Sequence, residues 1–336
     1  MKKFICLLIG FTLFLCAAGC GTFKGGTATV RINEVTHSIF YAPLYVAIEN
    51  GYFKDEGIKT ELTNGGGADK SMAALLSGSA DVAFCGPEAA IYVINEGKSD
   101  APRVFGQLTK RDGSFLVGRY KDDDFRWEKL ENKTVIAGRT GGVPAMTFEY
   151  VVNKHGLYNG TNITLDNSVQ FNLMGPSFEG GNGDYVTLFE PTASDFQKAG
   201  KGYIVASVGE ESGEIPYTTF MSLTSYIAKN RDVLVKFLTA LQRAIQHLNT
   251  APAATVAEEI KGQFPDTPTE SITASLESYI KIDAWTKNMA MTEDALERLQ
   301  SVMTSAGELN KKVSLSALAD NTLAEEVFEK VMNRGG

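Results

Sequence analysis

Residues Phe40 to Leu62 constrain the fold of this chain more than any other stretch, because a loop, a helix and a new strand follow one another within them. Pro43 suits the first turn of a helix, where its missing N–H has no intrahelical partner anyway. Leu44 to Ile48 supply an apolar helical face. Gly51 ends this helix, since glycine tolerates the left-handed conformation common after a helix. Ile58 to Leu62 then alternates polar and apolar residues, as a strand does.

The loop before this helix is the first candidate for ligand binding. Ala28 to Val35 is strand-like, so the loop Thr36 to Tyr41 follows a strand and precedes a helix. In an open α/β sheet, ligands bind in loops at the carboxyl ends of the strands. The side chain of His37 suits either a hydrogen bond to a ligand or a cap on the next helix. The candidate ligand-binding residues of this loop are His37, Ser38, Phe40 and Tyr41.

Strand-like and helix-like segments alternate along the chain as far as about residue 223, which predicts an α/β fold with largely parallel, doubly wound sheets. After Asn230 the pattern changes to amphipathic helices. The further predicted strands are 81–85, 103–108, 114–119, 134–137, 162–169, 185–189, 203–208 and 217–223. The further predicted helices are 69–77, 89–97, 143–155, 192–199, 232–249, 271–282, 292–306 and 323–332.

The first 19 residues have the pattern of an export signal. Lys2 and Lys3 give a positive start, and the apolar run Phe4 to Leu15 is too short for a transmembrane helix, which needs about 20 apolar residues. Small residues directly before Cys20 resemble the site at which bacterial lipoproteins are cleaved and lipidated, with plain secretion as the alternative. We therefore expect residues 1–19 to be a signal peptide and residues 20–27 a lipidated tether. Cys20 would then anchor the chain on the extracytoplasmic face of the cell membrane.

The mature chain is long enough for two domains. About 315 residues remain after the signal, which is too many for one compact core. We expect domain I to comprise residues 28–115 and 217–336, and domain II to comprise residues 116–216. The two crossings, near Gly113–Arg119 and near Ile215–Ser222, would form a hinge.

Composition and motifs disfavour several classes of protein. The formal net charge is −8, and an acidic surface argues against nucleic-acid binding. Apart from the signal and Cys20, Cys85 is the only cysteine, so a monomer has no disulfide. The chain has three histidines and no G-x-S-x-G, H-E-x-x-H, C-x-x-C or Walker motif. We therefore expect no catalytic residues, metal or cofactor.

Three motifs occur in an order typical of one family of transport proteins. They are the stretch from Pro43 to Ile58, the Gly-rich turn Gly65-Gly66-Gly67, and Leu75 to Ala83. From about Thr27 onward the chain resembles solute-binding proteins of ABC importers, in the group that takes up nitrate, aliphatic sulfonates, taurine and thiamin pyrimidine precursors. The resemblance implies a two-domain periplasmic-binding-protein-like fold (type II), with the helices after Asn230 packed on domain I. It also implies a monomer that binds a small-molecule solute and meets an ABC permease and its ATPase.

Further loops at strand ends would face the first loop across a cleft. The helix after Gly142 has no acidic residue in its first turn, so its free N–H groups and dipole favour an anionic or accepting group. Glu88 and Glu190 would instead attract an amine, and Glu88 alternatively complements the dipole of its own helix. Tyr217, at the return crossing, would help to line a partly apolar pocket. The candidates from these segments are Cys85, Gly86, Glu88, Gly141, Gly142, Val143, Glu190 and Tyr217.

The sequence thus predicts a lipid-anchored receptor for an amine-bearing, zwitterionic or heteroaromatic solute, such as a pyrimidine precursor or a taurine-like compound. The alternative within the same family is a binder of alkanesulfonate or nitrate anions, for which Arg139 is the one evident cleft arginine. An enzyme of pyrimidine-precursor synthesis is an alternative of another class, disfavoured by the export signal and by the lack of a His/Cys-rich cluster. A sensor ectodomain is disfavoured because no membrane-spanning or signalling segment follows in the sequence.

Overall fold

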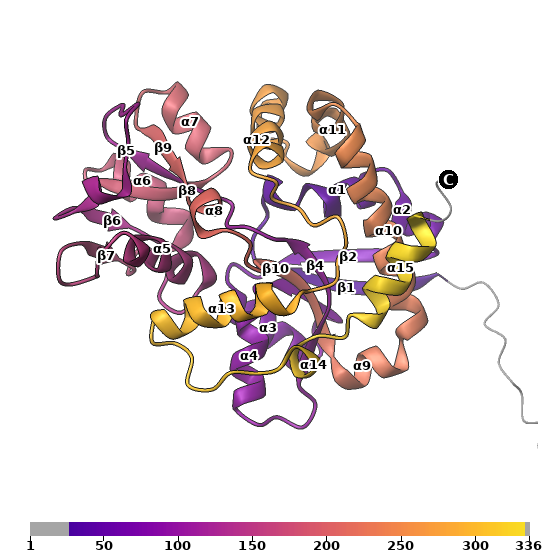
Figure 1. The fold of residues 1–336 in the computed structure, drawn as a ribbon. Helices are drawn as coiled ribbons and strands as arrows, with labels where there is room; N and C mark the ends of the chain where they lie inside the picture. The colour runs from indigo at the N-terminus through magenta and orange to yellow at the C-terminus, as the bar shows by residue number, and fades with distance from the viewer. Residues whose placement is uncertain (1–26, 333–336) are drawn as a thin grey trace, which may run out of the picture.

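The chain forms two five-stranded β-sheets flanked by helices in the computed structural model, which describes residues 27–332 (Figure 1). This arrangement confirms the expected two-domain α/β fold. The predicted signal peptide, Cys20 and nearly all of the tether lie outside the described residues. We call the first sheet with its helices the first domain, and the second sheet with the helices inserted between its strands the second domain.

The first sheet has the order β2 (Ile58–Asn64), β1 (Ala28–Glu34), β3 (Val82–Cys85), β10 (Thr218–Leu223) and β4 (Pro102–Thr109). Strand β1 is parallel to β2 and β3, whereas β10 is antiparallel to both of its neighbours. Four strands therefore run in one direction, and β10, which returns to this sheet from the second domain, runs against them.

The second sheet has the order β7 (Thr164–Asp166), β6 (Thr134–Ile136), β8 (Tyr185–Phe189), β5 (Ser114–Gly118) and β9 (Tyr203–Ser207). Strand β6 is parallel to β7 and β8, and β5 is antiparallel to β8 and β9. The single antiparallel strand is again the one that arrives from the other domain. The largely parallel character predicted from the sequence therefore holds in both sheets.

Two short segments connect the domains. Residues 110–113 lead from β4 to β5, and residues 213–217 lead from the helix after β9 to β10. The first crossing thus overlaps the expected Gly113–Arg119 only at Gly113, because Ser114 already pairs with Phe189 inside the second sheet. The return crossing lies at the start of the expected range Ile215–Ser222.

Most helices lie between consecutive strands, as the alternation predicts. They are α1 (Ala42–Glu49), α2 (Tyr52–Asp55), α3 (Ala68–Leu76), α4 (Glu88–Asn95), α5 (Val143–Lys154), α6 (Met174–Glu179), α7 (Thr192–Lys198) and α8 (Val208–Ser212). Short 3-10 helices are η1 (Ile39–Tyr41), η2 (Trp127–Leu130), η3 (Phe171–Leu173) and η4 (Lys261–Gln263). Pro43 lies in the first turn of α1, and Gly51 is left-handed with a φ of 73°, as expected.

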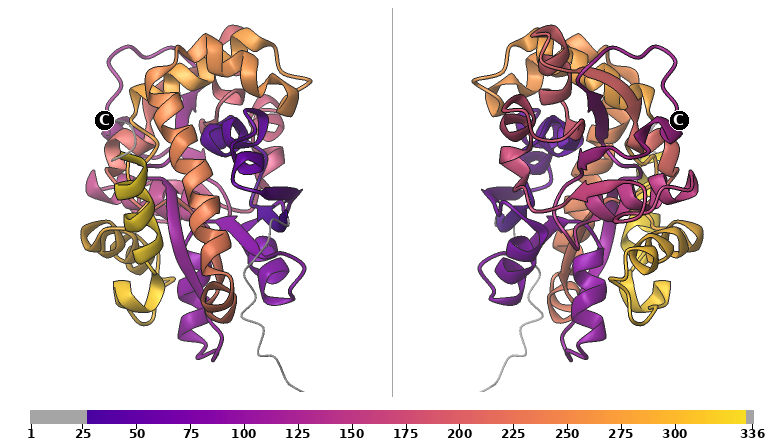
Figure 2. Two further views of the ribbon diagram at one scale, coloured as in Figure 1. Left: turned by 90° about the vertical axis from the view of Figure 1, so that its right-hand side faces the viewer. Right: turned by 90° about the vertical axis from the view of Figure 1, so that its left-hand side faces the viewer.

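The C-terminal helices contact both domains. They are α9 (Thr224–Lys229), α10 (Arg231–Thr250), α11 (Ala253–Ile260), α12 (Thr269–Lys281), α13 (Glu293–Ser305), α14 (Leu315–Leu318) and α15 (Thr322–Met332). The long helix α10 packs on α1 and lies beside α15 (Figure 2). However, α12 contacts α7 and α13 contacts α5, both in the second domain. The expectation that these helices pack on the first domain is therefore incomplete.

The main apolar core joins the two domains. It includes the stacked rings of Phe84 and Phe220, whose centroids are 4.3 Å apart, and continues to Val117 in β5. A second cluster surrounds Trp127 and Phe148 in the second domain. Across residues 27–332, none of the helices combines the length and the apolar character needed to span a bilayer.

Candidate functional site

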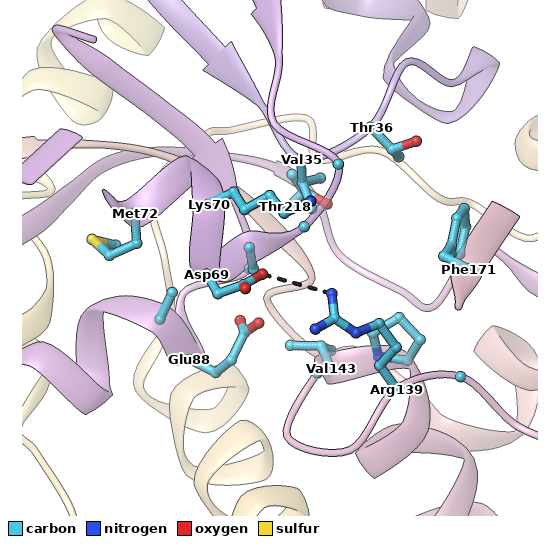
Figure 3. Close-up of a pocket in the computed structure, with 18 of the residues that line it drawn as sticks. Val35, Thr36, Asp69, Lys70, Met72, Glu88, Arg139, Val143, Phe171 and Thr218 are labelled. Atoms are coloured by element: carbon cyan, nitrogen blue, oxygen red, sulfur yellow. Dashed lines mark ion pairs between the residues drawn. The ribbon is translucent and has the colours of Figure 1, made fainter. Parts of the chain in front are cut away.

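A pocket of about 700 Å³ lies between the two domains, at the carboxyl ends of strands from both sheets (Figure 3). The first domain contributes the loops that contain Ser38 and Gly86, and the second contributes the loop that contains Gly141. Tyr217, at the return crossing, also lines the pocket. The loops of two doubly wound sheets thus face each other, which is the usual position of ligands in this architecture.

Glu88 places a buried carboxyl group in the wall of this pocket. The residue is 3% exposed, and its Oε2 atom has no hydrogen-bond partner within residues 27–332. Burial raises the pKa of the Glu88 carboxyl to about 7, while nearby backbone N–H groups, including that of Val143 in the opposite wall, favour the charged form. A buried acceptor without a partner costs free energy. A donor on a bound molecule would satisfy it.

The start of helix α5 forms the facing wall. Gly141 has a φ of 76°, which favours glycine, and Gly142 precedes the helix without a side-chain cap. The first turn contains Pro144 and no acidic residue. Pro144 has no N–H and the Val143 N–H lies near the Glu88 carboxyl, so the later N–H groups of the first turn, together with the dipole of this 12-residue helix, favour an accepting or anionic group.

Two charged side chains bridge the pocket walls. Arg139, in the loop before α5, lies 3.8 Å from the Asp69 carboxylate at the start of α3, measured from guanidinium nitrogen to Oδ1 (Figure 3). Both side chains are at least half exposed, so water screens the pair. Lys70 lines the same region of the pocket. The pocket therefore presents both signs of charge.

Aromatic rings line another part of the pocket. The ring centroid of Phe40 lies 5.7 Å from that of Phe189 and 5.8 Å from that of Tyr217, both in edge-on arrangements. Phe171 of η3 packs on Phe189 at 5.5 Å and is 42% exposed. Tyr41 completes this surface. A solute with a flat or apolar part would find matching contacts here.

The structure brings together most of the residues singled out from the sequence. Nine of the twelve candidates line the pocket: Ser38, Phe40, Tyr41, Gly86, Glu88, Gly141, Gly142, Val143 and Tyr217. The other three, His37, Cys85 and Glu190, do not line it. Each of them is engaged elsewhere.

Glu190 contacts two helices rather than the pocket. Its carboxylate accepts hydrogen bonds from the backbone N–H and the hydroxyl of Ser194 at 3.0 and 2.8 Å, and from the Ser278 hydroxyl at 3.0 Å. Its own N–H donates to the Tyr279 hydroxyl at 3.1 Å. The residue is 2% exposed, and groups of the protein itself supply the hydrogen bonds that this carboxylate accepts. Glu190 was expected to face the cleft, but in the structure it connects α7 and α12 instead.

His37 ties the first loop to a distant segment. Its Nδ1–H donates to the Glu34 carboxylate at 2.7 Å and its Nε2–H donates to the Gln263 carbonyl at 2.9 Å. The Tyr45 hydroxyl donates to the same carboxylate at 2.7 Å. The hydrogen bond to Glu34 raises the pKa of His37. His37 thus positions the loop instead of reaching the pocket or capping a helix.

Cys85 belongs to the core. It is the last residue of β3 and is fully buried, and burial raises the pKa of its thiol well above the usual value. Its carbonyl accepts a hydrogen bond from the Thr219 hydroxyl at 3.3 Å. Its side chain therefore serves packing between β3 and β10 rather than ligand contact.

Several parts of the pocket wall were not among the sequence candidates, and three of them supply charged or aromatic side chains. The turn after β2 and the start of α3 contribute Asp69 and Lys70, the segment 170–172 contributes Phe171, and β8 contributes Phe189. The Gly-rich turn before Asp69 was a usable signal, because it also follows a strand and precedes a helix. Nothing in the local sequence marks residues 170–172 as part of the wall.

No cluster of three or more His, Cys, Asp or Glu side chains suited to a metal ion occurs between residues 27 and 332. Within the same range, the pocket wall contains no histidine or cysteine. The lining residues offer groups for hydrogen bonding, charge pairing and aromatic contact.

Comparison with known sequences reveals one family. The model of the family described as "NMT1/THI5 like" matches residues 39–255. The protein named "Putative binding protein YtlA" of Bacillus subtilis (strain 168) is 44% identical over 298 residues, which cover 89% of this chain and 89% of that protein.

Comparison with solved structures reveals the same architecture. The alkanesulfonate-binding protein SsuA from Xanthomonas axonopodis pv. citri bound to MOPS has a TM-score of 0.70 and 16% identity, over 88% of this chain and 99% of that chain. The periplasmic nitrate-binding protein NrtA from Synechocystis PCC 6803 has a TM-score of 0.70 and 15% identity, over 91% of this chain and 89% of that chain. At such identities the likeness shows a shared fold alone.

Proposed function

The chain belongs to the NMT1/THI5-like family, and from this premise we propose that it is an extracytoplasmic solute-binding protein that delivers a small organic solute to an ABC importer. The relative from Bacillus subtilis is named a binding protein, which supports binding rather than turnover. Structural neighbours named as components of ABC import systems support the role in uptake. The partners would be the solute, a permease and its ATPase.

The observation that carries this proposal is the buried Glu88 carboxyl opposite the start of α5. Its Oε2 atom lacks a partner among the described residues, and the uncapped turn after Gly142 offers donors within the same pocket. A solute with an amine or another N–H-rich group would satisfy Glu88, and an acceptor or anionic group on the same solute would meet the α5 N–H groups. The aromatic wall adds contact for a flat or apolar part.

A second candidate is a binder of alkanesulfonate or nitrate anions. Arg139 and Lys70 both line the pocket, and two structural neighbours are named for these anions. Against it stands the desolvated Glu88 carboxyl, whose charged form repels an anion. The enzyme of pyrimidine-precursor synthesis finds no comparable support in the pocket chemistry.

Calorimetric titration with four probes tests the function. The probes are 4-aminopyrimidine, taurine, propane-1-sulfonate and sodium nitrate. We expect 4-aminopyrimidine or taurine to bind more tightly than the two simple anions, and small-angle scattering to show a smaller radius of gyration in the saturated protein as the cleft closes. Preferential binding of nitrate or propane-1-sulfonate would support the second candidate, and the absence of binding by all four would contradict the proposed solute class.

Attachment to the membrane through Cys20 is a separate part of this proposal. A single lipidated residue would be the membrane contact of the mature protein. We expect Cys20→Ala to release the protein into the soluble fraction outside the cell. Continued fractionation of the variant with membranes, in cells that lack the importer, would contradict lipid anchoring.

A further inference from the structure

Helices α7 and α12 form a contact between the second domain and the C-terminal part of the chain (Figure 1). At one end of this contact, the Ser271 hydroxyl donates to the Asp195 carboxylate at 3.2 Å, and Lys198 Nζ donates to the Ser271 hydroxyl at 3.3 Å. Glu190 lies at the other end, directly before α7. Hydrogen bonds between polar groups therefore join the two segments at both ends of this contact.

Glu190 divides its hydrogen bonds between α7 of the second domain and α12, which also packs on η1 of the first domain. Ser194, on helix α7, which begins two residues after Glu190, supplies two donors to the carboxylate. Across the interface, Ser278 of α12 supplies a third donor, and the Tyr279 hydroxyl accepts the hydrogen bond from the Glu190 N–H. Glu190 is 2% exposed and Tyr279 is fully buried, whereas Ser194 and Ser278 are partly exposed at the edge of the contact.

The same residues also contact the aromatic wall of the pocket. The ring of Tyr279 lies 4.9 Å from that of Phe40, centroid to centroid. Phe40 in turn lies 5.7 Å from Phe189, the residue directly before Glu190. Phe40 and Phe189 both line the pocket. A change in the distance between α7 and α12 would therefore change the spacing of the Phe40 and Phe189 rings in the pocket wall.

We propose that Glu190, Ser278 and Tyr279 form an interdomain clasp, which is made when the domains approach each other around the pocket and broken when they separate. This inference rests on the proposed function, because it concerns the closure of the same pocket. Glu190 is then a positioning residue that acts through the domain arrangement and does not touch the solute. On opening, the carboxylate keeps its two donors from Ser194 and exchanges the donor from Ser278 for water.

The two serines provide a matched pair of variants, because each donates one hydroxyl to the same carboxylate. Ser278→Ala removes a link between the domains, whereas Ser194→Ala removes a link within the second domain. The experiment measures the radius of gyration of the full chain without any added solute, by small-angle scattering. Thermal unfolding of each variant confirms that it is folded.

We expect Ser278→Ala to shift the population toward the open form by roughly threefold or more, and so to increase the radius of gyration, whereas Ser194→Ala leaves it unchanged. Glu190→Ala, which removes the shared acceptor, should resemble Ser278→Ala, and the double variant should add little to either. The same radius of gyration for Ser278→Ala and Ser194→Ala would overturn the clasp. Because no solute is present, this result stands apart from the outcome of the binding titrations.

Discussion

A β-carbon on residue 86 would lie 2.0 Å from Oε2 of Glu88, so the carboxyl group keeps its place only because residue 86 is glycine. The acidic side chain at the start of α4 thus occupies the space that a side chain in the turn after β3 would need. The carboxyl lies in the pocket wall and does not point into the solvent around the first turn of α4.

Gly86→Ala should therefore weaken solute binding with little effect on folding. The new methyl group meets the end of a flexible side chain, which can rotate away, so we expect a change in unfolding free energy within about 1 kcal/mol. The displaced carboxyl loses its position toward the solute, and we expect affinity to fall about tenfold or more. Titration calorimetry and urea unfolding measure the two effects.

Gly262→Ala is the matched control for this variant, because a β-carbon there would lie 3.9 Å from the nearest atom, Oε2 of Glu49. Equal losses of affinity in the two variants would contradict the role assigned to Gly86.

Glu88→Gln should make the solute-free protein more stable at pH 8 but not at pH 5. The pKa of the carboxyl is about 7 in the folded protein against 4.5 in the unfolded chain. Between these values unfolding releases a proton, so the carboxyl lowers the free energy of unfolding progressively as pH rises through this window. Above pH 7 the penalty reaches roughly 3 kcal/mol, because the two pKa values differ by about 2.5 and each pH unit contributes about 1.4 kcal/mol.

Denaturant unfolding of both proteins at pH 5, 6, 7 and 8 measures this difference, with Glu96→Gln at the exposed C-terminal end of the same helix as control. A stability difference between Glu88→Gln and the parent that does not vary with pH would refute the assignment of a raised pKa. Greater stability after removal of a group that binding requires would mark Glu88 as a functional residue.

The sequence predicted those parts of the pocket that depend on local chain geometry. Gly86, Glu88 and Gly141 to Val143 follow strands and open helices, so their places at the sheet edges could be inferred from strand–loop–helix order. Glu190 also follows a strand, but the partners that turn it away from the pocket, Ser278 and Tyr279, come almost 90 residues later. A local sequence pattern cannot indicate a contact with residues so far away in the chain.

The same reason explains His37 and the missed residues. Gln263, the acceptor for His37, is 226 residues away in sequence. Phe171 reaches the pocket because Phe189, from another element, supports its ring. The side-chain direction at these positions is decided by tertiary packing, whereas the strand and helix order that defines the fold is decided by residue pattern.

His37→Gln should destabilise the protein most at low pH. The hydrogen bond to Glu34 raises the pKa of His37 above 6.5 in the folded state. Its contribution is therefore fully present below pH 6.5 and is lost as pH rises through the folded pKa. We expect a deficit on the order of 1 kcal/mol at pH 5.5 that shrinks by pH 9. A deficit that grows with pH in urea unfolding would be inconsistent with this pairing.

Asp69→Asn should have a small, salt-sensitive effect. The pair with Arg139 is exposed and 3.8 Å long, and such pairs contribute at most about 1 kcal/mol. We therefore expect solute affinity to change less than about fivefold, and the change to vanish at high salt. Titrations at low and high salt check this, and a loss of more than tenfold at both would show that Asp69 contacts the solute directly.

The central claim is that the Glu88 carboxyl accepts a hydrogen bond from an N–H-rich group of the solute. Calorimetric titration of Glu88→Gln at pH 8 tests this claim most directly. The titrant is 4-aminopyrimidine or taurine, whichever binds the parent protein more tightly, with sodium nitrate as the contrasting probe. We expect the aminated probe to bind about 10- to 150-fold more weakly to the variant, the loss typical of a hydrogen bond to a charged group, and nitrate to bind equally well or better. Unchanged or improved affinity for the aminated probe would contradict the claim and favour the anion-binding alternative.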